Sequence, residues 1–207
     1  MIKKYFAALS ATALIGVAPH ALAASSTDLT VTGAITPSAC TPTLSGGGII
    51  DHGKLSAKDL NQDKPTTLPW QTLQLTVSCD AATAFRLLPT DNRSGTSDDS
   101  NDFGLGFVNG DRKLGGYVVR IRTPIGDGVA VQSLLSATNG NTWFASPVVS
   151  PNQLSAFGAV GGPTTPIAIK DLLADLRVST QIARADSLDL TNEVALDGSA
   201  TITIAYP

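Results

Sequence analysis

The best candidate for a catalytic residue is His52, which follows Asp51 and a run of glycines. A serine-hydrolase mechanism places a histidine between an acid and a nucleophilic serine. The sequence has no Gly-x-Ser-x-Gly turn to present such a serine. We therefore interpret His52 as a histidine at the surface or at a strand end, and we predict that the protein is not an enzyme.

Two further clusters resemble ligand sites only in part. Asp98, Asp99 and Asp102 suggest a calcium loop, but an EF-hand requires glycine at its sixth position and a distant glutamate. Counted from Asp98, the sixth position is Phe103, so we predict a solvated acidic turn. The triplet Gly104-Leu105-Gly106 begins a phosphate-loop pattern that goes no further. We predict no metal and no cofactor.

The first 23 residues have the pattern of a secretory signal peptide. Lys3 and Lys4 precede an apolar run over 6–17, and Ala21-Leu22-Ala23 forms a small-x-small cleavage site. The run is too short for a permanent membrane helix, and no later segment is long enough either. Cleavage leaves 12 basic and 17 acidic residues, a net charge of −5. Since nucleic-acid binding needs clustered basic residues, we predict no nucleic-acid partner.

The exported part contains two cysteines, Cys40 and Cys79. In an oxidising compartment two cysteines predict one disulfide. Two thiols and the single remaining histidine fall short of the usual zinc ligand sets. Cys79 continues an alternating apolar series formed by Leu73, Leu75 and Val77, so it belongs to the buried face of a strand. We expect the disulfide to lie at the core.

The composition is typical of an all-β domain with many turns. About 184 residues remain after cleavage, enough for one core of ordinary size, and the full chain has 19 glycines and 12 prolines. Alternation predicts strands over 73–79 and 117–123, with a turn at Gly126-Asp127-Gly128 and a hairpin partner over 129–135. We also predict a short strand over 49–55, an exposed mobile loop over 89–102 and a long surface connection over 146–166.

The segment from Ile169 to Ile182 fits two structures. Alternation from Leu172 to Ile182 favours a long strand, whereas the spacing of Ile169, Leu172 and Leu176 also suits a helix. We predict a strand from about Asp175 onward, preceded by a short helical turn.

Two well-patterned strands are predicted at the two ends of the chain. Each alternates apolar positions with polar or small ones, so each has one apolar face. The apolar-face positions are Leu29, Val31, Gly33 and Ile35 in the first strand, and Ala200, Ile202, Ile204 and Tyr206 in the second.

These end segments, with a cysteine after the first strand, a second cysteine about forty residues later and a penultimate tyrosine, resemble a chaperone–usher fimbrial (pilus) subunit. The resemblance is strongest to a divergent branch of bacterial fimbrial subunits formerly catalogued as a domain of unknown function. It implies an incomplete immunoglobulin-like (pilin) β-sandwich that lacks its final strand. The implied organisation is a signal peptide at 1–23, an N-terminal donor-strand extension at 24–38 and the sandwich at 39–207.

The resemblance also implies a function and partners. A periplasmic chaperone would lend the missing strand, an outer-membrane usher would export the subunit, and the extension of a neighbouring subunit would replace the chaperone by donor-strand exchange. Leu29, Val31 and Ile35 would enter the neighbour's groove, with Gly33 where the groove is shallow. The strand containing Ala200, Ile202, Ile204 and Tyr206 would form the groove edge and bind the chaperone. The product is a fimbria on the cell surface that contributes to adhesion.

The sequence departs from the family in two respects. Family members usually carry a glycine further from the C-terminus than Gly198, and this chain is longer than a minimal shaft subunit. The alternative function is a monomeric secreted or periplasmic β-sandwich that binds a carbohydrate or another small ligand. Exposed aromatic residues would favour this alternative, but we predict that Trp70 and Trp143 lie in strands.

Overall fold

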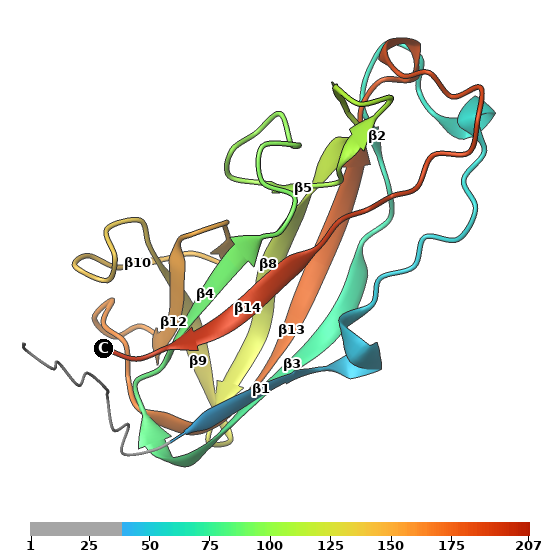
Figure 1. The fold of residues 1–207 in the computed structure, drawn as a ribbon. Helices are drawn as coiled ribbons and strands as arrows, with labels where there is room; N and C mark the ends of the chain where they lie inside the picture. The colour runs from blue at the N-terminus through green and yellow to red at the C-terminus, as the bar shows by residue number, and fades with distance from the viewer. Residues whose placement is uncertain (1–38) are drawn as a thin grey trace, which may run out of the picture. The chain divides into compact units, whose positions relative to one another are not determined.

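The computed structural model describes residues 39–207, which form an all-β domain (Figure 1). The predicted signal peptide, the extension and the positions Leu29, Val31, Gly33 and Ile35 lie outside the described residues. The strands are β1 (Cys40–Leu44), β2 (Thr66–Thr67), β3 (Gln71–Thr83), β4 (Arg86–Asp91), β5 (Phe103–Gly104), β6 (Phe107–Val108), β7 (Arg112–Lys113), β8 (Gly115–Gly126), β9 (Val129–Ser136), β10 (Phe144–Ala145), β11 (Val148–Val149), β12 (Leu154–Ala159), β13 (Ile169–Ile182) and β14 (Ala200–Ala205).

The strands pair antiparallel in the order β1-β3-β13-β8-β9-β12-β4-β14. The first four form one layer and the last four form the other, joined where the β8–β9 hairpin pairs Ile125 with Ala130. β1 and β14 are therefore the two outermost strands of the path. Figure 1 shows β1 in blue and β14 in red, with β13 visible in the space between them.

The core lies between the two layers because alternate side chains of each strand point inward. On the long strand β13, Leu172 and Leu176 are buried, whereas Leu173 between them is 39% exposed. The opposite layer contributes Phe85, Leu87 and Phe157. Among residues 39–207, no helix has the length and apolar character needed to cross a bilayer.

Several predicted strands are confirmed, and the ambiguous segment is resolved. The observed strands β3 and β8 contain the predicted strands 73–79 and 117–123, and β9 pairs with β8 as the predicted hairpin partner. The whole of Ile169–Ile182 is strand, so the predicted helical turn before Asp175 is wrong. A register shift between Ile169 and Asp171 lets Ile169 also point into the core, which is why the apolar spacing resembled that of a helix.

The predicted strand over 49–55 is wrong. Gly46, Gly47 and Gly48 all have positive φ angles, a conformation that glycine adopts without strain. This turn ends the pairing of β1 with β3 at Leu44, and the chain continues without regular structure up to the short 3₁₀ turn Ala57–Asp59. The segment 49–56 is consequently an irregular segment that belongs to neither sheet.

The predicted exposed loop over 89–102 begins too early. β4 runs through Pro89 to Asp91, and both residues are buried. The carboxylate of Asp91 accepts hydrogen bonds from the backbone N–H groups of Arg93 (2.8 Å) and Gly104 (3.0 Å). The hydroxyl of Thr96, also buried, donates to the carbonyl of Arg93 and accepts from the N–H of Gly106. The hydrogen bonds of Asp91 and Thr96 thus hold the start of this loop against the domain.

The predicted surface connection over 146–166 is also wrong in its centre. β12 lies between β9 and β4, and its residues Leu154–Gly158 are all buried. Small residues allow this close approach: a Cβ atom added at Gly158 would lie 2.9 Å from the carbonyl oxygen of Thr165. The serine, alanine and glycine content that suggested a loop instead reflects tight packing in the middle of a layer.

Candidate functional site: a groove between the two edge strands

The outer edge of β14 has no strand partner among the described residues. Its inner edge pairs with β4 over six positions, from Ala200 opposite Asp91 to Ala205 opposite Arg86. Ile202 and Ile204 are half-buried and pack against the core, whereas Thr201 and Thr203 are exposed on the other face. The outer edge therefore presents backbone N–H and C=O groups beside incompletely covered apolar side chains.

β1 has a similar open edge. Among the strands that the structure describes, it pairs only with β3, in a register that places Cys40 opposite Cys79 and Leu44 opposite Leu75. Leu44 is half-buried and packs against the core. Two open edges, one from each layer, thus lie at the two ends of the strand path, within the part of the chain that the structure describes.

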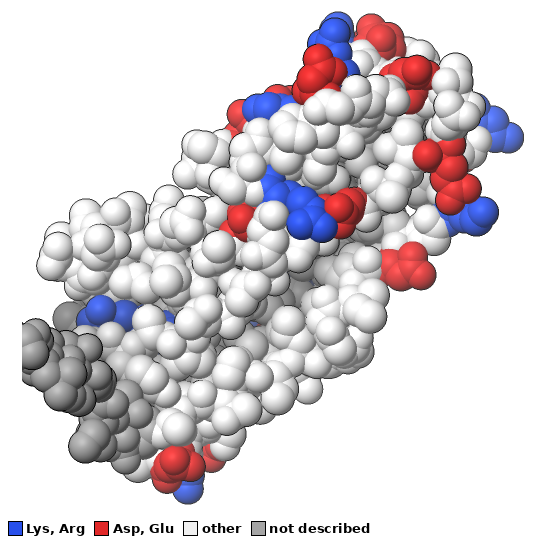
Figure 2. Space-filling model, viewed as in Figure 1, with Lys and Arg blue, Asp and Glu red and all other residues white. Residues whose placement is uncertain are grey.

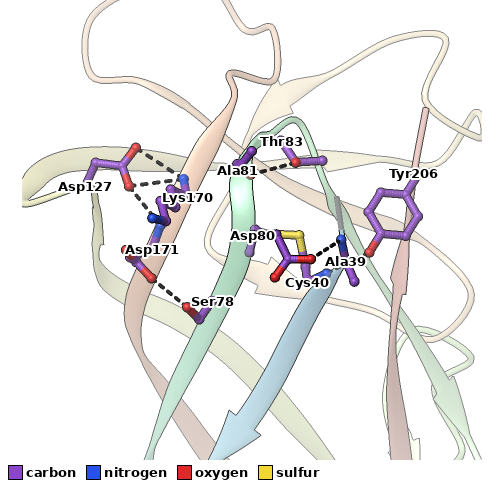
Figure 3. Close-up of a disulfide and its surroundings, with 11 residues drawn as sticks. Ala39, Cys40, Ser78, Asp80, Ala81, Thr83, Asp127, Lys170, Asp171 and Tyr206 are labelled. Carbon is purple, nitrogen blue, oxygen red and sulfur yellow. Dashed lines mark hydrogen bonds between the residues drawn. A yellow bond between two sulfur atoms is a disulfide. The ribbon is translucent and has the colours of Figure 1, made fainter. Parts of the chain in front are cut away.

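The two edges meet at one end, beside the predicted disulfide, which is confirmed between Cys40 and Cys79 (Figure 3). The backbone N–H of Cys40 donates a 2.9 Å hydrogen bond to the hydroxyl of Tyr206. The backbones of Ala39 and Asp80 exchange a further bond of 3.0 Å, in which the N–H of Asp80 donates. The bond between Ala39 and Asp80 extends the pairing of β1 with β3, whereas the bond from Cys40 to Tyr206 joins the two edges and closes one end of the space between β1 and β14.

Beyond this closed end, a groove of about 310 Å³ runs between the edges. Its walls include Leu44 and Ile50 on one side and Ala200 and Ile202 on the other. Its floor is the inner face of the first layer, on strands β3, β8 and β13, and is formed by Leu73, Tyr117, Val119, Leu176 and Val178. In Figure 2, viewed as in Figure 1, the surface beside β14 is hollowed and almost free of charged residues. Core side chains are therefore accessible from outside through the groove.

A second hollow of about 590 Å³ continues the groove. The two hollows share Ile50, His52 and Leu196, so they form one depression. The walls of the second hollow are the irregular segments 50–57 and 190–196, and its floor includes Leu114 and Ile182. Both walls of the depression thus change from strands to irregular backbone along its length.

His52 attaches one of these walls to the floor. The side-chain amide of Gln71 donates to its Nδ1 (3.1 Å), and the Nε2–H group then donates to the hydroxyl of Thr180 (2.9 Å). Burial lowers the pKa of His52 below its usual value of 6.5, and the neighbouring Asp51 only partly opposes this effect. These two hydrogen bonds attach the segment around His52 to β3, through Gln71, and to β13, through Thr180.

An exposed ion pair holds the other wall just before β14. The guanidinium of Arg93 donates to both carboxylate oxygens of Asp197, at 2.9 and 2.8 Å. These bonds hold the pKa of Asp197 below its usual value. Across the second hollow, Lys54 and Glu193 approach to 3.8 Å, and both side chains are almost fully exposed. A single exposed pair of this kind contributes little, so it opposes separation of the walls only weakly.

The other chemical candidates from the sequence do not form a site. Among residues 39–207, no three His, Cys, Asp or Glu side chains are placed to hold a metal ion. The pKa of Asp102 is raised by burial and by the nearby Asp99, and the backbone and side chain of Asn101 bond to the carboxylate of Asp99. The acidic turn is thus held by its own hydrogen bonds.

The structure brings together the predicted C-terminal strand and the first cysteine, which are far apart in the chain. Ala200 and Ile202 line the groove, while Ile204 and Tyr206 lie toward its closed end. Sequence patterns did not indicate the walls at 49–57 and 190–199: the segment 49–55 was predicted as a strand, and no pattern was recognised over 190–199. The glycine run at 46–48 was the available signal that the chain leaves the sheet there.

Comparisons with known proteins give one family and two relatives. Residues 29–123 match the model of a family described as proteins of unknown function, DUF1120. Protein GltF of Escherichia coli (strain K12) is 28% identical, and the match covers 94% of both chains. The uncharacterized protein YhcF of the same organism is 24% identical, over 81% of this chain and 85% of its own length. The family match spans both cysteines and the predicted donor positions from Leu29 to Ile35.

Proposed function

We propose that this protein is a structural subunit of a bacterial surface fimbria, assembled by the chaperone–usher pathway through donor-strand exchange and contributing to adhesion. The described residues would then be an immunoglobulin-like pilin sandwich that lacks its final strand. The observation that carries the proposal is the groove between β1 and β14, where each layer has an open edge and the core is accessible. An added strand would pair with both edges at once.

The alternating segment near the N-terminus has the chemistry of such a strand. Leu29, Val31 and Ile35 would cover the apolar floor, and Gly33 would pass a point with no room for a side chain. Burying the three branched side chains would contribute roughly 5–9 kcal/mol. Backbone hydrogen bonds to the two edges would add about 0.5–1.5 kcal/mol each.

The direction of assembly follows from geometry. A chain that donates a strand from one end and accepts one in a groove elsewhere makes a head-to-tail contact, which repeats without closing and gives a fibre. Before assembly, the open edges and apolar groove would be an aggregation hazard. A periplasmic chaperone that occupies the groove would remove this hazard, and the outer-membrane usher would exchange it for the next subunit.

The proposal is tested by supplying the strand in cis. Chain 37–207 would be compared with the same chain carrying residues 27–36 fused to its C-terminus through a flexible linker. We expect the fusion to unfold cooperatively at a much higher temperature, because it completes the groove with its own strand.

A matched control is the same fusion with Val31→Asp, which places a charge against the apolar floor. This fusion should melt close to the unfused chain. If the two fusions melt at the same temperature, or the unfused chain is already as stable as the fusion, the groove does not accept this segment.

A further inference from the structure

Outside the groove, the outer face of the first layer carries a tryptophan with two arginines against it. Arg120 on β8 and Arg177 on β13 are directly paired across the strands. Their guanidinium carbons lie 5.5 and 5.0 Å from the ring centroid of Trp70. Trp70 lies one residue before β3, and Trp143 lies one residue before β10. The prediction that both tryptophans lie in strands is therefore wrong. The side chain of Trp70 remains 39% exposed.

The two guanidiniums are not neutralised by any ion pair within residues 39–207. The four ion pairs of the described chain involve Lys54, Arg93, Lys113 and Arg184 as cations. The next row of this face pairs Arg122 with Asp175, and the carboxylate of Asp175 accepts a 2.9 Å bond from the hydroxyl of Thr123. These two rows of cross-strand pairs thus contain three arginines and one carboxylate, although the overall charge of the chain is negative.

Paired like charges are unfavourable across neighbouring strands, and the cation–π contacts with Trp70 compensate only in part. A bound oxyanion would supply the missing counter-charge. Guanidinium groups are suited to this role because their planar donor forks match carboxylate and sulfate oxygens. The pair formed by Arg120 and Arg177 therefore has the electrostatic character of an anion-binding site rather than that of an internal salt-bridge network.

The surroundings favour a sugar as the carrier of the anion. The next strand, β3, continues the row with uncharged polar side chains: Thr72 is paired with Arg177, and Gln74 is paired with Asp175. Both are exposed and can exchange hydrogen bonds with hydroxyl groups. An exposed indole beside polar groups offers an apolar surface for a sugar ring. The row crosses three strands of an open face, which suits an extended chain.

We propose that Trp70, Arg120 and Arg177 form a binding site for an anionic polysaccharide. The guanidiniums hold a carboxylate or sulfate of the sugar, and the exposed part of the Trp70 ring contacts the sugar ring. This site uses neither edge of the groove, so it stands independently of the proposed assembly.

The test is calorimetric titration of the full chain, purified from expressing cells, with three probes. A hexagalacturonate carries carboxylates alone, a heparin hexasaccharide carries sulfates as well, and a maltohexaose is neutral. We expect at least one acidic probe to bind, more weakly as salt rises, and the neutral probe not to bind. Preference between the acidic probes identifies the anion. If neither acidic probe binds, or the neutral probe binds equally well, the proposal is wrong.

Variants locate the site. Arg120→Gln and Arg177→Gln should each weaken binding of the acidic probe at least tenfold, whereas Arg177→Lys, which keeps the charge, should weaken it less. The matched control is Arg184→Gln, whose guanidinium pairs with Asp186 instead; its binding should equal that of the unmodified chain. Thermal melting checks that each variant is folded. Equal losses for Arg184→Gln and Arg177→Gln, or no loss for Arg120→Gln and Arg177→Gln, would overturn the assignment.

Discussion

The backbone N–H of Cys40 donates a 2.9 Å hydrogen bond to the hydroxyl of Tyr206, although the two residues are 166 positions apart in the chain. This bond joins the start of one edge strand to the residue that follows the other. It lies beside the disulfide between Cys40 and Cys79, so one end of the groove is fixed both covalently and by hydrogen bonding.

Replacing Tyr206 with phenylalanine should lower the free energy of unfolding by about 1 kcal/mol, because a partly buried N–H group loses its acceptor. Chemical denaturation of the purified domain would measure this change. Tyr117→Phe is a matched control, since the Tyr117 hydroxyl makes none of the hydrogen bonds described above. Equal effects of the two substitutions would contradict a specific role for the Tyr206 bond.

Removing the disulfide should have a larger effect. The cysteines are 39 positions apart, and in the chain-entropy model a loop of this size contributes roughly 4 kcal/mol. The double variant Cys40→Ala with Cys79→Ala should unfold at a correspondingly lower denaturant concentration. Reduction of the unmodified protein should give a similar loss, and a loss below about 1 kcal/mol in both experiments would refute the expectation.

Gly198→Val should obstruct the groove. A Cβ atom at position 198 would lie 2.9 Å from a ring carbon of Tyr117 and 3.1 Å from the side chain of Leu105, so any larger group must occupy the space beside them. Binding of a peptide with the sequence of residues 27–36 should weaken at least tenfold, as measured by fluorescence titration. The control Thr203→Val changes the exposed face of β14 and should bind the peptide normally. Unchanged binding by Gly198→Val would count against the predicted position of the donor strand.

Mild acid should weaken the attachment of the 49–56 wall. Burial lowers the pKa of His52 in the folded state, so the unfolded chain binds a proton more readily once the pH falls below about 6.5. The free energy of unfolding therefore decreases as the pH falls below about 6.5. His52→Gln should remove this part of the pH dependence. Denaturation curves for both chains at about pH 7.5 and 5.5 test this, and parallel pH dependence would exclude His52 as its source.

The Arg93–Asp197 pair should stabilise the segment before β14 at neutral pH and lose this effect in strong acid. The pKa of Asp197 is lowered chiefly by its hydrogen bond with Arg93, so the stabilisation is present above its usual value of 3.8 and is lost as the pH falls through the lower folded-state pKa. Asp197→Asn should speed amide hydrogen exchange in residues 190–199 at neutral pH. Exchange rates that match those of the unmodified chain would show that other contacts hold this wall.

Strong alternation made part of this fold predictable. β3, β8 and β13 each bury alternate side chains, and their apolar periods are visible in the sequence from Leu73, Tyr117 and Leu172 onward. β12 was missed because Ser155, Ala156 and Gly158 are buried although all three are small and form no alternating series of large apolar residues. Their burial depends on the close approach of β4 and β9, which is a tertiary effect.

The candidate site was predictable only in its regular part. The period of β14 indicated Ile202 and Ile204, and the cysteine count indicated the disulfide. No period marks the walls of the second hollow, and the contact of Arg93 with Asp197 spans 104 positions. The approach of Arg120 and Arg177 to Trp70 likewise depends on the register of three strands, which the sequence does not specify locally.

The pairing of β14 with β4 also has a kinetic consequence. Its register joins Ile202 to Pro89, residues 113 positions apart, whereas the β8–β9 hairpin joins residues that are close in the sequence. Local pairs form early and distant ones late, because closing a long loop costs entropy before any contact compensates it. We therefore expect the pairing of β14 with β4 to form after the β8–β9 hairpin, so that one edge of β4 stays unpaired during part of folding.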